Sequence, residues 1–301
     1  MNPVEQSIKR KIEAIGTPLK EWDIKINRGI LTGCNDAFII DEAKKEELIT
    51  EDPKSAEIIR PILRGRDIKR YAYDWAHLYL IATFPACHYD IEEFPAVKRH
   101  LLSFDKERLL AAGYTDIANH SRLLGEYCHQ RLEQSGKDVV VKGKKVIIDG
   151  KAQKARKKTG NRWFETQDQI GYWEDFNEQK IVYREISTEM EACLLPAGYY
   201  ITNKCYMITC KNKNILYYLL AFLNSNIFNR IILQSANITG GKGADFLGNV
   251  PLIIPNKITI DKINAIQRTK GSTSRIKEYN RLFNSLYGIE ENDVAKCLLE
   301  E

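Results

Sequence analysis

The sequence predicts an α+β fold, in which a mixed β-sheet carries a helical insertion and is followed by C-terminal helices. Three observations predict this class. Apolar residues recur at helical spacing close to the N-terminus and again after residue 256. Short runs of strand-type residues follow one another between residues 181 and 210. A helical pattern from residue 95 to about residue 132 interrupts the strand-rich part of the chain.

The first third of the chain predicts one helix and several short strands. Val4, Ile8, Ile12 and Ile15 share one face of a helix, and Gly16 is a typical helix stop. Further strands are predicted over Trp22–Ile26, Phe38–Ile40 and His77–Thr83.

The middle of the chain predicts two helices and a hairpin. Pro95 suits the first turn of a helix, whose buried face would carry Val97, Leu101, Phe104 and Leu109. A second helix is predicted to begin at Asn119 or Ser121 and to end near Leu132. A small hairpin is expected around Lys142–Lys144, and Ala152–Gly160 is expected to form a loop because it is almost free of apolar residues.

The last third predicts a compact set of strands and helices. The strands are expected over Ile181–Ile186, Ala192–Leu195, Tyr199–Thr202, Tyr206–Cys210 and between Pro251 and Pro255. A helix over Asn214–Gln234 should break at Asn224-Ser225, and the C-terminal helices should be interrupted at Gly271-Ser272. We therefore expect a helical connector over residues 1–20, a main domain over 21–255 with a variable basic insertion near 136–162, and a helical region over 256–301.

Length and composition exclude several classes of protein. A chain of 301 residues with 44% hydrophobic residues can bury a core without disulfides or a structural metal. The longest apolar stretch, Ile215–Phe222, is too short to span a membrane, and Met1–Gly16 is charged and periodic, unlike a signal peptide. The seven cysteines form no C-x-x-C pair. We expect reduced thiols and a cytoplasmic location.

The positive charge of the chain is concentrated in one segment. Residues 136–162 contain ten lysines and arginines against Asp138 and Asp149, a net charge of +8. Because the whole chain carries +5, the remainder carries −3. Clustered cations on a nearly neutral body favour a polyanionic partner, although a solvated loop remains an open alternative. Phosphate contacts are predicted for Lys142, Lys144, Lys145, Lys154, Lys157 and Lys158.

Two further motifs place cations beside turns and aromatic residues. In R-G-R-D-I-K-R-Y, the cations Arg64, Arg66, Lys69 and Arg70 are predicted to clamp a nucleic-acid backbone or to order the adjacent loop. Gly65 would allow a close turn there, and Asp67 would orient a neighbouring arginine through a bidentate pair. Base reading is predicted for Asn161, Arg162 and Arg156, since amide and guanidinium groups match adenine and guanine edges. Lys242 in the glycine-rich loop is predicted to lie near a phosphate.

No catalytic motif is recognisable, and one enzymatic alternative stays open. The chain has no Pro-Pro dipeptide and no strand–G-x-G–helix unit, so neither an Asn-Pro-Pro-Tyr site nor an S-adenosylmethionine pocket is supported. Asp168 followed by Glu178 and Lys180 has the outline of a metal-dependent nuclease site, in which carboxylates hold Mg²⁺ and a lysine assists the attacking water. A protein-interaction scaffold is the other alternative.

Several blocks in fixed order resemble one family. They are I-N-R-G-I-L-T-G-C-N-D-A-F-I-I-D from Ile26, R-P-I-L-R-G-R-D-I-K-R-Y from Arg60, R-W-F-E-T-Q-D-Q-I-G-Y-W-E-D-F-N-E-Q-K-I-V-Y-R-E-I-S from Arg162, and L-L-A-F-L-N-S from Leu219. The ending S-L-Y-G-I-E-E-N-D-V fits as well. This order resembles the TaqI-like C-terminal specificity domains of type IIG restriction–modification enzymes and related adenine methyltransferases, over most of residues 24–294.

The resemblance implies a target recognition domain. Such a domain would bind a short asymmetric site in double-stranded DNA and present it to an N6-adenine methyltransferase, in cis or in trans, which flips the adenine out. The chain would then be a C-terminal fragment or a separate specificity subunit, and its residues 136–162 would be a variable region that sets the target sequence. No cofactor is expected in this chain, because S-adenosylmethionine and Mg²⁺ would belong to catalytic domains elsewhere. Glu178-Gln179-Lys180 would be a strand entry of this family, which weakens the nuclease alternative.

Overall fold

The computed structural model describes residues 3–103, 139–142, 145–148, 151–154, 161–234, 241–268, 272–290 and 293. They form two compact units. The first unit comprises described residues within 1–29, 63–76 and 174–301, and the second unit comprises those within 30–62 and 77–173. This division differs from the three consecutive segments expected, because the N-terminal and C-terminal helices pack in the same unit as the strands between residues 180 and 209.

The first unit combines an antiparallel sheet with helices. Its elements are α1 (Pro3–Ile15), β1 (Thr17–Pro18), η1 (Leu19–Glu21), β2 (Lys25–Arg28), η3 (Gly65–Asp67), β5 (Ile68–Lys69), β6 (Ala72–Tyr73), η6 (Trp173–Asn177, entering from the second unit), β11 (Lys180–Arg184), β12 (Ala192–Leu195), β13 (Tyr200–Ile201), β14 (Cys205–Thr209), α8 (Lys213–Leu223), η7 (Ile227–Leu233), α9 (Ala244–Gly248), β15 (Pro251–Leu252), α10 (Lys257–Arg268) and α11 (Ser272–Leu286). The main sheet has the order β12-β11-β14-β2, and its strand pairs are antiparallel. The α+β class is thereby confirmed.

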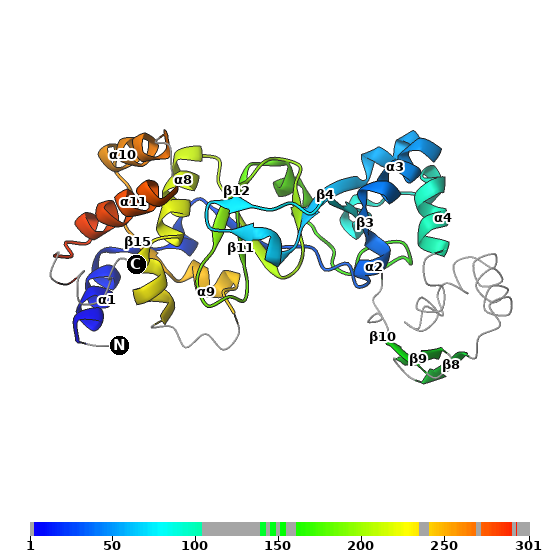
Figure 1. Ribbon diagram of the computed structural model, residues 1–301, viewed down its shortest axis with the longest axis horizontal. Helices are drawn as coiled ribbons and strands as arrows, with labels where there is room; N and C mark the ends of the chain where they lie inside the picture. The colour runs from blue at the N-terminus through cyan, green and yellow to red at the C-terminus, as the bar shows by residue number, and fades with distance from the viewer. Residues whose placement is uncertain are drawn as a thin grey trace. The chain divides into compact units, whose positions relative to one another are not determined.

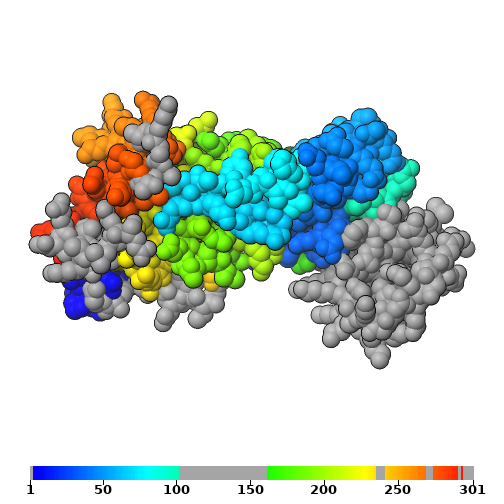
Figure 2. All heavy atoms as spheres, viewed as in Figure 1, coloured from blue at the N-terminus to red at the C-terminus, as the bar shows by residue number. Residues whose placement is uncertain are grey.

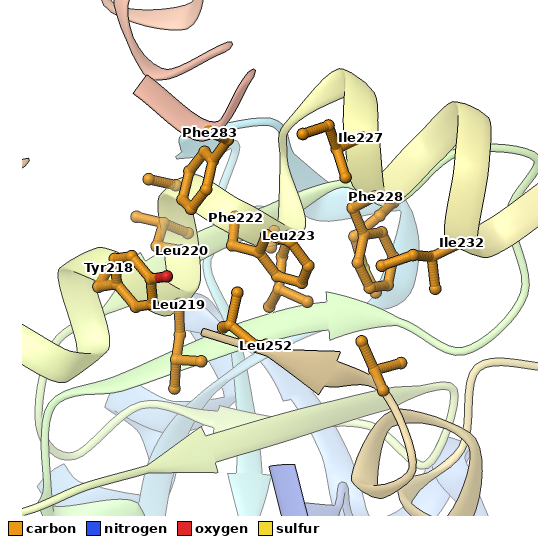
Figure 3. Close-up of a cluster of buried hydrophobic side chains, with 14 of the residues drawn as sticks. Tyr218, Leu219, Leu220, Phe222, Leu223, Ile227, Phe228, Ile232, Leu252 and Phe283 are labelled. Atoms are coloured by element: carbon orange, nitrogen blue, oxygen red, sulfur yellow. The ribbon is translucent and has the colours of Figure 1, made fainter. Parts of the chain in front are cut away.

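The core of the first unit lies between this sheet and the helices. Every residue of β11 except Arg184 is buried, and so is each residue of α8 from Tyr218 to Leu223. A helix that is buried on nearly all sides is expected to be apolar on nearly all sides, as α8 is. Figure 3 shows Phe283 of α11 against this helix, and its ring lies 5.5 Å from that of Tyr218 and 5.4 Å from that of Phe222. Helices α8, α10 and α11 pack together (Figure 1).

The break predicted at Asn224-Ser225 is confirmed. Helix α8 ends at Leu223, and the following helix η7 has π-type hydrogen bonding and is bent by 67° from α8. Within the described part of the chain, no single helix is long and apolar enough to cross a bilayer, and this bent pair satisfies the length and composition test only when its two helices are taken together. Side chains of both helices belong to the core cluster.

The segment Leu63–Ala76 lies on the sheet of the first unit. The Tyr71 N–H donates to the Ala192 carbonyl of β12 over 2.9 Å. In Figure 2 this segment, in cyan, lies directly against the green atoms of the strand-rich part. Tyr73 and Trp75 pack on Tyr199, with ring centroids 6.2 Å and 5.4 Å apart. The alternating aromatic residues are therefore packing residues, and the segment presents its cations on a supported backbone.

The second unit is built around short strands and helices. Its elements are α2 (Asn35–Phe38), β3 (Ile39–Asp41), α3 (Glu42–Glu51), η2 (Pro53–Glu57), β4 (Ile59–Leu63, whose last residue belongs to the first unit), β7 (Leu78–Ile81), η4 (Pro85–Cys87), η5 (Ile91–Glu93), α4 (Pro95–Ser103), β8 (Val139–Lys142), β9 (Lys145–Ile148) and β10 (Lys151–Lys154). Strand β7 pairs antiparallel with β3 and with β4. The helix predicted at Pro95 is confirmed as far as Ser103, whereas its predicted continuation to Leu109 and the predicted helix over 119–132 lie outside the described residues.

The basic segment contains a three-stranded antiparallel sheet. The predicted hairpin is formed by β8 and β9, and β10 adds a third strand along β9. The loop expected over Ala152–Gly160 is therefore wrong for residues 152–154, and residues 155–160 lie outside the described part. The sequence K-A-Q-K has no apolar alternation, so its strand depends on pairing with β9 rather than on its own pattern.

Candidate nucleic-acid interface

A buried carboxylate holds Arg64 in the first unit. Arg64 Nε and Nη2 donate to the two Asp67 carboxylate oxygens over 3.0 and 2.8 Å, and the Arg64 backbone N–H donates to the same carboxylate over 2.8 Å. The Asp67 side chain is only 5% exposed, whereas that of Arg64 is 28% exposed. The bidentate pair predicted for Asp67 is confirmed. The pair fixes the plane of the Arg64 guanidinium and leaves accessible the edge of the guanidinium that faces away from Asp67.

The other cations of this segment differ in how they are held. Arg66 and Lys69 are exposed and form no ion pair with the described residues. Arg70 donates to Glu189 over 3.0 Å. Tyr71 has a left-handed backbone with a φ of +61°, whereas a Cβ at Gly65 would meet only ordinary contacts at 3.6 Å or more. The close turn expected at Gly65 is present, since η3 begins there and the Asp67 N–H donates to the Arg64 carbonyl over 3.0 Å, although this turn does not require glycine.

The second unit repeats the arrangement of Arg64 and Asp67. The Arg162 Nε and the Arg162 backbone N–H each donate to the Glu165 carboxylate over 2.7 Å. The Glu165 side chain is 6% exposed and that of Arg162 is 43% exposed. The guanidinium also lies 4.7 Å from the centre of the Phe164 ring, which adds a cation–π contact. Glu165 was not predicted, although the R-x-x-E spacing matches R-x-x-D and was a usable signal.

Asn161 supports this turn through its amide. Its Nδ2 donates to the Thr166 and Gln167 carbonyls over 2.9 and 2.7 Å, and its Oδ1 accepts from Gln169. A base would have to displace these partners to be read by the same amide. Base reading by Asn161 stays a prediction, and the geometry favours a role in shaping the loop that presents Arg162.

The backbone register aligns three lysines of the basic segment. Lys142 of β8 is directly opposite Lys145 of β9, and Lys154 of β10 is directly opposite the same Lys145. Like charges at directly opposed sheet positions repel one another, and an anionic partner offsets that repulsion. The remaining predicted residues of this segment, Lys144, Arg156, Lys157 and Lys158, lie outside the described residues.

Lys242 is buried, contrary to what its glycine-rich loop indicates. Lys242 is only 2% exposed, and its Nζ donates to the Ser187 carbonyl and hydroxyl over 2.7 and 2.6 Å. Burial and the neighbouring Arg184 lower the pKa of Lys242 to about 8. Gly241 is required beside it, because its φ is +87° and a Cβ would meet Glu185 at 3.0 Å. A phosphate contact by Lys242 stays a prediction, but it would require release from Ser187.

Lys180, the lysine of the nuclease alternative, is not placed to assist an attacking water. Lys180 is fully buried at the start of β11, and its Nζ donates to the Phe176 and Pro196 carbonyls over 2.8 and 3.2 Å. The ammonium therefore faces the interior rather than a water beside Glu178. No group of three or more His, Cys, Asp or Glu residues able to hold a metal ion occurs among the described residues.

Lys180 predicts a specific pH dependence of stability. Burial lowers the pKa of Lys180 from 10.5 to about 7. Between those values the unfolded chain binds the proton and the folded chain does not, so the free energy of unfolding should rise with pH, by up to about 1.4 kcal/mol per pH unit. Lys180→Met should lose this rise, and it leaves the Pro196 carbonyl without its donor, whereas the Phe176 carbonyl still accepts from the Gly198 N–H. Urea unfolding of the wild-type chain and of Lys180→Met at pH 7, 8 and 9 measures this rise in the free energy of unfolding. An equal rise in both proteins would contradict the assignment of the lowered pKa to Lys180.

The fold and these paired cations define a class of α+β proteins that hold arginines on buried carboxylates and contain a strongly basic segment. A family model for TaqI-like C-terminal specificity domains matches residues 60–245. Because the match covers more than half of the chain, this protein belongs to the TaqI-like C-terminal specificity domain family. Membership supports DNA recognition as its function.

Two solved structures are similar to this chain. A type IIL restriction-modification enzyme, MmeI, in complex with DNA shares 11% identity at a TM-score of 0.50 over 94% of this chain and 36% of that one. The type IIG restriction endonuclease BpuSI shares 12% identity at a TM-score of 0.49 over 95% of this chain and 33% of that one. This chain therefore spans about a third of the length of each enzyme. No curated protein matches it in sequence.

Proposed function

We propose that this protein is a sequence-specific double-stranded DNA recognition module of a restriction–modification enzyme. The observation that carries the proposal is the family match over residues 60–245. The fold of MmeI, a restriction-modification enzyme in complex with DNA, adds support. Since this chain corresponds to about a third of such an enzyme, we assign adenine methylation, with S-adenosylmethionine, to a partner domain in cis or in trans. Any Mg²⁺-dependent cleavage belongs to a partner as well.

The proposed contacts divide into phosphate binding and base reading. The lysines of the basic segment bind phosphates, since they combine high charge density with a backbone register that places Lys142 and Lys154 each opposite Lys145. Arg66, Lys69 and Arg70 contact the DNA backbone. Arg162 reads a guanine edge, because its guanidinium is held in one plane by Glu165 and Phe164. Arg156 remains a proposed second base reader.

Arg162 gives the sharpest test of base reading. Arg162→Ala should weaken binding by about 1–3 kcal/mol for duplexes with the preferred base at one position and leave substitutions at other positions unchanged. Glu165→Gln should give a smaller effect at the same position, because it frees the guanidinium without removing it. Competition titrations with duplexes that each differ at one base pair measure both effects.

Arg99→Ala is the matched control, since Arg99 is exposed in the second unit and pairs with Glu51. It should leave base preference unchanged. Equal losses for every duplex with Arg162→Ala would assign that arginine to phosphate binding, and an unchanged affinity and preference would remove it from the interface.

A further inference from the structure

The first unit contains a polar cavity of about 500 Å³. Its lining comes from segments far apart in the sequence: Arg70 after β5, Glu189 between β11 and β12, Arg230 in η7, and Lys277 and Asn280 in α11. The volume lies within the range of pockets that bind small molecules. Unlike most such pockets, its lining is dominated by charged side chains and carboxamides, which favours a polar ligand.

The cavity carries an excess of positive charge. It is lined by three cations and a single carboxylate, that of Glu189. That carboxylate already pairs with Arg70 over 3.0 Å. Arg230 and Lys277 form no ion pair with any residue that the structure describes. Cations that converge on one cavity repel each other unless an anion lies between them, so the lining favours an anionic ligand.

The walls of the cavity are held in place by buried amides. Asn229 Oδ1 accepts from the Met190 N–H over 2.6 Å, and its Nδ2 donates to the Ser225 carbonyl over 3.0 Å. Asn280 Oδ1 accepts from the Asn226 N–H over 2.9 Å. These bonds join η7 to α11 and to the segment before β12. Helix η7 carries both Asn229 and Arg230, which line the cavity, and π-helical segments are frequent at functional sites.

We propose that this cavity binds a phosphate group through Arg230 and Lys277, with Arg70 as a third cation. A guanidinium matches the oxygens of a phosphate bidentately, and an ammonium adds a compact charge beside it. The phosphate comes either from the DNA backbone or from a free phosphate-bearing molecule. Binding of a DNA backbone phosphate rests on the proposed function, whereas binding of a free phosphate-bearing molecule does not.

The test compares Arg230→Gln/Lys277→Gln with the wild-type chain in two assays. Calorimetric titration with inorganic phosphate measures the free anion, and a salt series with duplex DNA of random sequence measures the backbone source. Lys211→Gln/Lys262→Gln is the control, because both lysines are exposed in the first unit, lie outside the cavity and remove the same charge. Circular dichroism confirms that each variant is folded.

The two sources give different results. If DNA is the source, the cavity variant should lower the magnitude of the log–log salt slope by about two, and the control should not. If a free phosphate is the source, only the cavity variant should lose phosphate binding, by about tenfold or more, with DNA binding unchanged relative to the control. Equal behaviour of cavity variant and control in both assays overturns the proposal. Absence of DNA binding by the wild-type chain would contradict the proposed function but leave the phosphate titration decisive.

Discussion

Replacement of six of the eight lysines of the basic segment by glutamine is expected to lower the affinity for duplex DNA by about a thousandfold at physiological salt. The lysines are Lys142, Lys144, Lys145, Lys154, Lys157 and Lys158. Each contact with a phosphate releases condensed counterions, so the magnitude of the log–log salt slope should fall by about five. Fluorescence anisotropy of a labelled duplex over a salt series measures both quantities. Substitution tests the segment better than deletion of Lys151–Lys158 does, because β10 occupies half of that stretch.

A control with the same loss of charge separates local contacts from net charge. Six exposed lysines of the first unit are suitable: Lys11, Lys20, Lys211, Lys213, Lys257 and Lys262. Their replacement should reduce affinity only through the weaker overall field. Equal losses in both variants would show that the basic segment makes no specific contact with the DNA.

Asn224→Ala should destabilise the first unit by about 1–3 kcal/mol. Asn224 is fully buried, its Oδ1 accepts from the Ala192 N–H over 3.0 Å, and its Nδ2 donates to the Ala192 carbonyl over 2.9 Å. The amide thus pairs with β12 much as a neighbouring strand would. Alanine leaves the buried Ala192 N–H unpaired, which costs about 1–3 kcal/mol, whereas the Ala192 carbonyl still accepts from the Tyr71 N–H.

Urea unfolding measures this loss against Asn177→Ala, an exposed asparagine of the same unit. The control should change the free energy of unfolding by less than about 0.5 kcal/mol. Asn224→Asp should be intermediate or worse than alanine, since it keeps the acceptor, loses the donor and buries a charge. A change no larger than that of the control would show that solvent or a rearranged strand replaces the amide bonds.

The elements that were predicted correctly are those whose own sequences show a regular apolar spacing or contain residues that end a helix. Helix α1 was visible from its apolar spacing, and the bend after α8 was visible from Asn224-Ser225. Helix α3 was missed because Glu42–Glu51 buries only Leu48. Its cap, the Asp41 carboxylate accepting from the Lys44 N–H over 2.8 Å, was the available signal.

The features that sequence could not show depend on partners distant in the chain. Lys242 resembles a surface residue, and it is buried only because Ser187 lies where its ammonium can donate. The division into two units has no compositional marker at residues 29, 62, 76 or 173. Arg64 and Asp67 were predictable as a pair because both partners lie within four residues, and the same reasoning would have found Glu165. The cavity at Arg230 required the packing of η7 on α11.

Selection from a randomised duplex library tests the proposed function most directly. The selection is performed at about 150 mM salt, where non-specific electrostatic binding is already weakened. The proposal predicts enrichment of one short asymmetric sequence, with Arg162→Ala losing preference at a single position of it. Recovery of unenriched sequences, with binding that depends on salt but not on base order, would contradict sequence recognition by this protein.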